Sequence, residues 1–169
     1  MPAYIELTKG KRAIVDECLF VALSHFKWWA HKGRNSYYAA CHEVTPDGRK
    51  IRSMHAIVLQ LYGIHCQHQI DHKDGNGLNN QRDNLRPATL KQNAANRRLH
   101  RDSTSGFKGV HFNKKRQRWE ASITKDGHRR WLGFHDTAEE AAAAYDRAAI
   151  ALHGEFARTN EDMRRSVAG

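Results

Sequence analysis

Residues 71–93 read DHKDGNGLNNQRDNLRPATLKQN, and this stretch decides the fold of the middle of the chain. The Asp71-His72 pair stands at the end of an expected strand. The Asp-Gly and Asn-Gly steps of residues 74–77 tolerate positive φ angles and close tight reversals, so a loop starts there.

The loop ends near Asn84, and a helix is expected soon after it. Thr89 is suited to be the N-cap of a helix through LKQNAANRRL, which carries Asn93 on its first turns. The pattern predicts a strand, a loop and a helix that converge on one point.

Residue types at this point suit a nuclease that works with one metal ion. Such an enzyme holds a divalent cation against the scissile phosphate and deprotonates a water beside it, which requires oxygen ligands and an imidazole base. Asp71 and His72 supply one of each. Because neighbouring residues of a strand point to opposite faces, both reach one centre only if the strand twists into the turn that follows.

The order of these residues resembles that of the HNH endonucleases, in particular the homing endonucleases of phages and mobile introns with the ββα-metal motif. The resemblance covers about residues 54–98 and is carried by Ile70-Asp71-His72, Gly75-Asn76-Gly77, Asn84-Leu85-Arg86, Thr89 and Asn93.

The resemblance implies a role for each matched residue. Asp71 and Asn93 ligate the metal, His72 is the general base, and Asn84 stands with it among the catalytic residues because it braces the loop by hydrogen bonding. Met54-His55 before IVLQLYG resembles the lead-in helix of the family, and His55 is expected to be supporting.

Other interpretations of the motif are weaker. An Asp-Gly/Asn-Gly loop alone is a common turn without chemistry. An EF-hand is disfavoured because Gly75 falls one place early and Arg82 stands where the last ligand should be Glu. With Asn93 in the third HNH position, a hard ion, Mg²⁺ or Mn²⁺, is expected.

Zinc is not expected in this chain. Cys18, Cys41 and Cys66 form no C-x-x-C pair, which indicates neither a disulfide framework nor a zinc ribbon. His65, Cys66 and His68 lack a second ligand pair and are expected to line a loop. With no signal peptide and no apolar run of the ~20 residues that span a bilayer, we expect a cytoplasmic protein, in the host cytoplasm if a phage encodes it.

Charge favours a polyanionic partner. The chain has 169 residues, a formal net charge of +10 and a pI near 9.8. Residues 97–130 contain eleven Lys or Arg and three acidic residues, so this window alone contributes +8. Partner binding is expected to concentrate there.

Before the motif, residues 1–53 are expected to form two hairpins. AYIELT and RAIVDE flank Lys9-Gly10-Lys11, and SYYAACHEV and RKIRSMH flank Pro46-Asp47-Gly48. Between them, CLFVALSHFKWW predicts a short helix that runs into a strand. For at least one of Trp28 and Trp29, core packing is favoured over base stacking.

After the motif, the polar segment 102–106 indicates a linker to a second domain. FKGVHFNKKRQRWEASI, KDGHRRWLGFH and DTAEEAAAAYDRAAIALHG predict three strands followed by one helix, which Thr137 and Glu140 cap. Small residues at Ala141, Ala144 and Ala148, with Tyr145, allow this helix to lie close on the sheet.

These segments resemble the AP2 DNA-binding domain over about residues 105–160. The match is carried by Phe107-Lys108-Gly109-Val110, Trp119-Glu120-Ala121, Trp131-Leu132-Gly133, Glu140-Ala141-Ala142, Ala144-Tyr145-Asp146 and Asn160. In that family the sheet lies in the DNA major groove. The resemblance implies DNA contacts from Lys108, His111, Asn113, Arg118, Arg129 and Trp131. For single basic residues, a solvated hairpin end is the plainer interpretation.

The sequence predicts an α+β chain in which N-terminal hairpins lead into a ββα-metal HNH module, followed by a three-stranded AP2-like sheet with one helix. The expected division is 1–53, 54–101, a linker at 102–106, 107–160 and a tail at 161–169. The expected function is that of a DNA endonuclease of phage or mobile-element homing type, which nicks one strand of double-stranded DNA as a monomer and needs no membrane. A DNA-binding regulator with a vestigial nuclease and an RNA-binding module are the alternatives.

Overall fold

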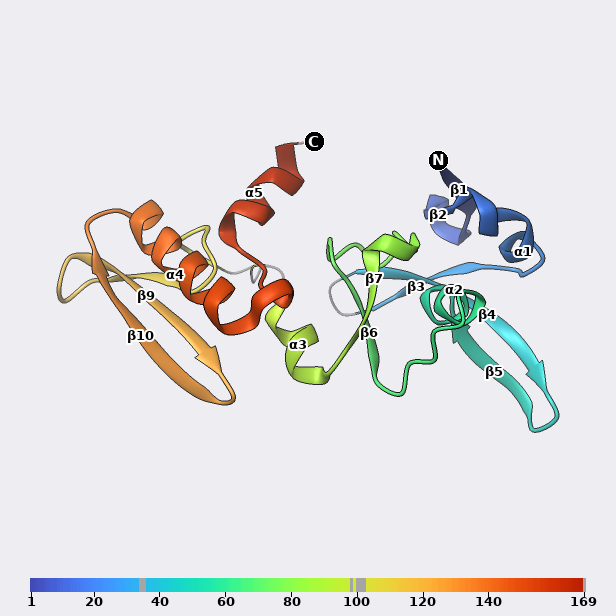
Figure 1. Ribbon diagram of the computed structural model, residues 1–169. Coiled ribbons are helices and arrows are strands. Elements are labelled where there is room, and N and C mark those ends of the chain that lie inside the picture. The colour runs from blue at the N-terminus through green and yellow to red at the C-terminus, as the bar shows by residue number, and fades with distance from the viewer. Residues whose placement is uncertain (34–35, 98, 100–102, 169) are drawn as a thin grey trace. The chain divides into compact units, whose positions relative to one another are not determined.

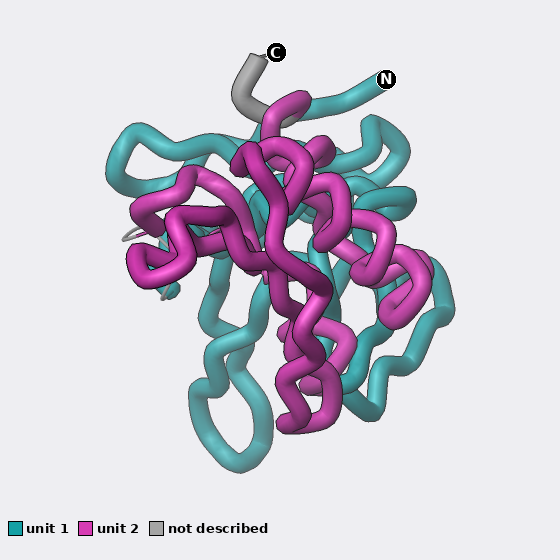
Figure 2. The backbone as a smooth tube through the Cα atoms, turned by 90° about the vertical axis from the view of Figure 1, so that its left-hand side faces the viewer, with its two compact units in different colours: residues 1–89 teal, residues 90–169 magenta. Residues whose placement is uncertain are grey.

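The computed structural model describes residues 1–33, 36–97, 99 and 103–168, and it combines helices with several small antiparallel sheets (Figure 1). The chain divides into two units, residues 1–89 and 90–169 (Figure 2). The boundary between the two units falls inside segment 54–101, which the sequence assigns to the nuclease module, and that assignment stays a prediction. The expected linker begins at Asp102, which lies outside the described residues.

Two hairpins open the first unit, as the alternating pattern predicts. β1 (Pro2–Glu6) pairs antiparallel with β2 (Arg12–Asp16) through the turn η1 (Thr8–Gly10). β4 (Tyr37–Thr45) pairs with β5 (Gly48–Ser53). A third strand, β3 (Trp29–Lys32), pairs with the other edge of β4 and completes a sheet of order β3-β4-β5.

The apolar segment between the hairpins forms a short helix and then a strand, as expected. It consists of η2 (Glu17–Leu19), α1 (Phe20–Ser24) and β3. Trp28 is buried, and its indole Nε1 donates to the Leu23 carbonyl at 2.7 Å. Trp29 is half-buried, with its ring 4.5 Å from that of His42. At least one of the two tryptophans therefore belongs to the core.

The remaining elements of the first unit are α2 (Met54–Leu61), β6 (Gln69–His72), η3 (Arg82–Asn84) and β7 (Leu85–Ala88). Their apolar side chains share one core with the N-terminal strands; its fully buried members include Val15, Leu23, Met54, Val58, Leu59 and Leu85. Residues 1–53 thus fold together with the segment after them.

The Gly/Asn loop is itself fastened to the first hairpin. Ile14 N donates to the Leu78 carbonyl at 2.8 Å, and Asn80 N donates to the Ile14 carbonyl at 2.7 Å. Arg82 N donates to Asp16 Oδ2 at 2.8 Å. The first hairpin therefore forms one wall for the loop that follows Asp71 and His72.

The second unit contains α3 (Leu90–Ala95), β8 (Val110–Asn113), β9 (Arg118–Lys125), β10 (His128–His135), α4 (Ala138–His153), η4 (Gly154–Phe156) and α5 (Asn160–Ala168). The strands form an antiparallel sheet of order β10-β9-β8, and α4 lies along one face of it (Figure 1). Ala141, Ala144 and Tyr145 are buried there. The expected three strands and helix are confirmed.

Helix caps explain two boundaries in this unit. Thr137 Oγ1 accepts from Glu140 N, and Glu140 Oε2 accepts from Thr137 N, which is the expected capping box of α4. Of the expected tail, residues 161–169, the described part lies in α5. Thr159 Oγ1 accepts from Asp162 N at 3.0 Å and Asp162 Oδ2 accepts from Thr159 N at 3.1 Å, so a second capping box starts that helix.

Among the helices of the described residues, none combines the length and the apolar character that crossing a membrane requires.

Candidate functional site

Asp71 and His72 are the last two residues of β6, and both are buried. Asp71 lies opposite Arg86 of β7. Arg86 Nε and Nη2 both donate to Asp71 Oδ2, at 2.9 and 2.7 Å. A buried carboxylate requires such a cation, and the two bonds fix its orientation.

The loop after His72 is braced from its far end by Asn84. Asn84 Oδ1 accepts from Asp74 N at 3.0 Å, and its Nδ2 donates to Asp74 Oδ1 at 3.0 Å and to the Asn79 carbonyl at 2.7 Å. Gly75 has a φ of 69°, which the Asp-Gly step of the sequence supplies. These bonds hold the end of β6 close to the start of β7.

Two aromatic side chains cover the His72 imidazole. The His55 ring lies 5.1 Å away at an interplanar angle of 82°, and the Tyr38 ring lies 5.8 Å away. Burial lowers the pKa of His72, which a hydrogen bond with the Asn80 side chain and nearby carboxylates partly offset. A neutral imidazole is the form that can accept a proton.

His55 stands on the first turn of α2, and its Nε2 lies 2.8 Å from Ser53 Oγ. Burial and the neighbouring His72 lower the pKa of His55 to about 3. His55 is thus a neutral ring that holds the edge of His72 by packing. This is the position that a supporting residue would take.

Tyr38 was not singled out in the sequence, and it comes from outside the HNH-like segment. Its ring fills the space between two glycines. A Cβ on Gly33 would lie 2.7 Å from the ring and a Cβ on Gly77 would lie 2.6 Å from it. In the sequence, only the loop glycine, Gly77, indicates that another group approaches the backbone closely. Tyr38 itself cannot be recognised, because nothing distinguishes it from other strand residues.

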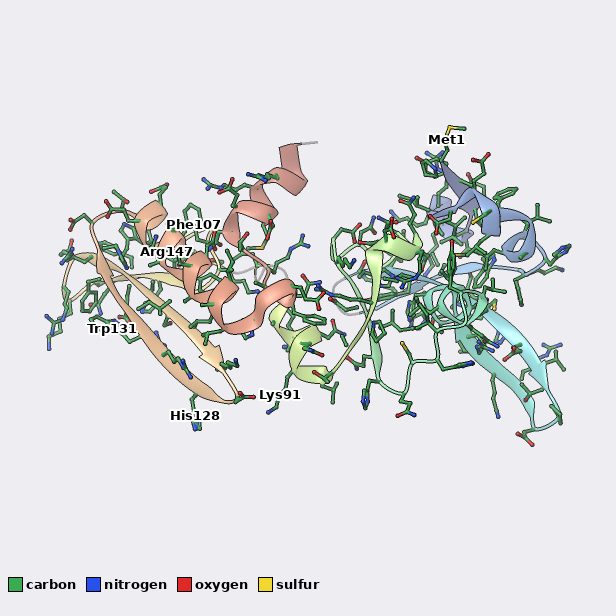
Figure 3. The ribbon with its side chains drawn as sticks, viewed as in Figure 1. Met1, Lys91, Phe107, His128, Trp131 and Arg147 are labelled. Atoms are coloured by element: carbon green, nitrogen blue, oxygen red, sulfur yellow. The ribbon has the colours of Figure 1, made fainter. Side chains whose placement is uncertain are left out.

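Asn93 lies on α3, which belongs to the second unit. Its pairing with Asp71 as a metal ligand therefore stays a prediction. Within its own unit, α3 is attached at both ends. Lys91 Nζ donates to Asp126 Oδ1 at 2.6 Å in the β9–β10 turn, toward which Lys91 extends in Figure 3.

Lys108 makes the second attachment, and this differs from its expected role in DNA contact. Its Nζ donates to the carbonyls of Ala95 and Arg97, at 2.8 and 2.9 Å, and lies 5.9 Å from the centre of the Tyr145 ring. Burial is the main cause that lowers the pKa of Lys108 to about 8. The ammonium satisfies carbonyls at the end of α3, so it is engaged within the protein.

The other five residues expected to contact DNA share one face of the sheet. Ala121 and Ile123 of β9 are buried toward α4, so the alternate residues of β9 face away from it. The register places cross-strand partners on that same side: His111 with Glu120, Asn113 with Arg118, Trp131 with Ser122, and Arg129 with Thr124. We call these eight residues the outer face. Trp131 is 61% exposed and projects from β10 (Figure 3).

Ion pairs and hydrogen bonds fix several of these side chains. Arg118 Nη2 lies 2.9 Å from Asp136 Oδ1. Arg129 Nε donates to Ser122 Oγ at 3.0 Å, and Arg129 Nη2 lies 3.3 Å from Glu120 Oε1. The outer face is therefore a mixture of cations, an aromatic ring and one central carboxylate.

The donor chemistry at Asp71 and Asn93 fits a hard divalent ion. A carboxylate and an amide carbonyl are oxygen donors, and Mg²⁺ is commonly held by one or two carboxylates together with water and phosphate. Arg86 supplies the orienting bonds that a ligating carboxylate usually receives. Within the described ranges no three His, Cys, Asp or Glu side chains gather around one point.

Comparison with known proteins gives two family matches. The family described as HNH endonuclease matches residues 54–95, and the family described as AP2 domain matches residues 105–155. Protein 3.8 of Escherichia phage T7 is 42% identical over 89 residues, which cover 53% of this chain and 73% of that protein. HNH endonuclease L560 of Acanthamoeba polyphaga mimivirus is 32% identical over 156 residues, 90% of this chain and 76% of the relative.

A plant protein matches a shorter part of the chain. APETALA2-like protein 2 of Oryza sativa is 43% identical over 78 residues, which make up 46% of this chain and only 17% of the plant protein.

The site and the two matches define a nuclease joined to a DNA-binding domain. The match with the mimivirus relative extends over both the HNH and the AP2 segments, since it covers 90% of this chain. The chain belongs to the HNH endonuclease family, and an AP2 domain follows its HNH segment.

Proposed function

We propose that this nuclease is a metal-dependent DNA endonuclease that hydrolyses phosphodiester bonds at a preferred site. The observation that carries the proposal is the Asp71-His72 pair, which is buried at the end of β6 and braced by Arg86 and by the Asn84 loop. An oriented carboxylate beside an imidazole supplies both groups that hydrolysis requires.

In this proposal His72 is the general base, which removes a proton from the attacking water. Asn84 acts through the loop that it braces, and His55 acts by packing against the base. Asp71 and Asn93 would hold one Mg²⁺ or Mn²⁺ ion. When bound, such an ion polarises the scissile phosphate and stabilises the charge that develops on the leaving oxygen.

DNA is bound through the outer face of the second unit. His111, Arg118, Arg129 and Trp131 are at least partly exposed there, and the major groove is wide enough to admit β-strands. Basic charge in residues 97–130 supports attraction to phosphates. Lys108 is not part of this proposed surface, because its ammonium is bonded within the protein.

The biological setting is proposed from the relatives. The T7 and mimivirus sources support a phage or mobile-element origin and action in a host cytoplasm. Since the chain holds one Asp-His/Asn set, we expect a monomer to nick one strand.

The proposal is tested by incubating the full chain with supercoiled plasmid and Mg²⁺. Relaxed circles should appear, and EDTA should abolish them. Binding without any cleavage would instead identify a regulator with an inactive nuclease module. Full activity in EDTA would contradict the metal requirement.

A further inference from the structure

Glu120 is an acidic residue in the centre of a surface expected to approach phosphates. Its side chain is only 15% exposed, although it points to the outer face. Neighbouring side chains on two other strands cover it. The position is unusual because an isolated carboxylate would repel DNA and weaken binding wherever the sheet docks.

Two donors and a histidine nitrogen meet at this carboxylate. Asn113 Nδ2 donates to Glu120 Oε2 at 3.2 Å, and His111 Nε2 lies 3.3 Å from the same oxygen. Arg129 Nη2 donates to Glu120 Oε1 at 3.3 Å. Glu120 therefore joins β8, β9 and β10 across the outer face.

The network limits what its members can do on DNA. Asn113 Oδ1 accepts from Arg116 N at 3.1 Å while Nδ2 donates to Glu120, so the amide is engaged at both ends. A bidentate contact with adenine needs both of these atoms. Arg129 is held at Nε and Nη2. Glu120 thereby fixes the orientations of its neighbours before DNA arrives.

The carboxylate keeps capacity of its own. An ionised carboxylate has about four acceptor sites, and Asn113 and Arg129 donate to two of these, with His111 Nε2 beside them. It can take one further hydrogen bond, and only from a donor. In the major groove guanine and thymine present only acceptors, whereas cytosine and adenine present an exocyclic amino group. The cytosine amino group is the usual partner of a glutamate, because adenine places its N7 acceptor next to its amino group.

We propose that Glu120 is a specificity-determining residue, whose carboxylate accepts a hydrogen bond from a cytosine amino group and rejects bases that present only acceptors there. The inference rests on the proposed binding of DNA by the outer face. According to this inference, Glu120 weakens binding to DNA in general. Only a site that places a hydrogen-bond donor next to the carboxylate compensates for that loss of affinity.

The test compares Glu120→Gln with Glu139→Gln in the full chain. Glu139 is exposed on the first turn of α4, so its variant makes the same change in net charge away from the outer face. Binding sites are selected from a random duplex library in EDTA, and affinities for selected and random DNA are then measured. Thermal unfolding checks that both variants are folded.

The wild type and Glu139→Gln should select the same site, with cytosine required at one position. Glu120→Gln should lose about tenfold of the discrimination at that position and keep the rest of the site. An identical base preference in Glu120→Gln would overturn the role of Glu120 while leaving nuclease activity and DNA binding intact. Failure of the wild type to bind DNA would overturn the proposed function itself, and the inference with it.

Discussion

His72 is covered by two rings, and the effect of burial on its pKa outweighs that of the nearby carboxylates. His55 and Tyr38 exclude water from the imidazole, and burial lowers the pKa of His72. Asp71 is bonded to Arg86, so its charge is largely balanced within the protein. The base is therefore neutral near pH 7. Because protonation of buried histidines is unfavourable in the folded state, acid should destabilise the first unit.

The first prediction concerns this acid sensitivity. The folded-state pKa of His55 is about 3. Its ordinary value is about 6.5, so the unfolded chain binds the extra proton in the window between these values. The contribution of neutral His55 to the free energy of unfolding is complete above pH 6.5, and it is lost as the pH falls toward the folded-state pKa. Between pH 7 and pH 5 the free energy of unfolding should drop by about 2 kcal/mol from this residue alone.

Chemical denaturation at several pH values measures this slope. A glutamine side chain does not titrate. His55→Gln should therefore flatten the dependence of the unfolding free energy on pH, whereas His65→Gln, in an exposed loop, should leave it unchanged. Equal slopes in the wild type and in His55→Gln would show that His55 is not held neutral.

The second prediction concerns Tyr38, whose ring is wedged between Gly33 and Gly77 against the two histidines. Tyr38→Ala should reduce the single-turnover cleavage rate at least about tenfold while changing DNA affinity little, because the base loses its position. Tyr38→Phe keeps the ring and should stay within about twofold of wild type. A large loss in Tyr38→Phe would show instead that the hydroxyl acts on the substrate.

At the scale of elements, α3 is the helix whose attachments were not predicted from the sequence. The sequence and the HNH family match both include it in the nuclease segment, and within the second unit it is attached through Lys91 and Lys108. The backbone of Lys108 is fixed as well, since Asn160 Oδ1 accepts from its N–H at 2.6 Å. The element that carries Asn93 is therefore built on the same body as the sheet.

The third prediction follows from this attachment. Lys108→Met keeps the apolar stem but removes the donor, and it should lower the stability of the second unit by about 1 kcal/mol. Hydrogen exchange should show lost protection at the end of α3, and Lys114→Met, in an exposed turn, is the control. If Lys108→Met weakened DNA binding as strongly as Arg129→Ala, Lys108 would be a DNA contact after all.

Most elements followed from sequence because their signals are local. Alternation and turn residues predicted the hairpins, and Thr137 with Glu140 predicted the start of α4. The helix α5 was missed although Thr159 and Asp162 carry the same capping pattern. Tyr38 and the bonds of Lys108 could not be predicted, since both depend on contacts between segments far apart in the chain.

At the scale of the whole molecule, one chain combines a single Asp-His pair with one DNA-binding sheet. The fourth prediction is that a monomer nicks one strand, because opposed strands present their phosphates with opposite polarity and one site serves one strand at a time. Each strand of a selected duplex is labelled separately and followed under single-turnover conditions. Simultaneous cuts, at a rate rising with the square of protein concentration, would indicate a two-fold symmetric dimer.

The central claim is that cutting depends on His72 and that DNA reading depends on the outer face. The direct measurement is the single-turnover cleavage rate, together with the affinity, of wild type, His72→Ala and Arg129→Ala on one selected duplex. His72→Ala should lose most cleavage, at least about a hundredfold, with affinity within a few fold, and Arg129→Ala should lose affinity and site preference first. Cleavage by His72→Ala at the wild-type rate would contradict the account.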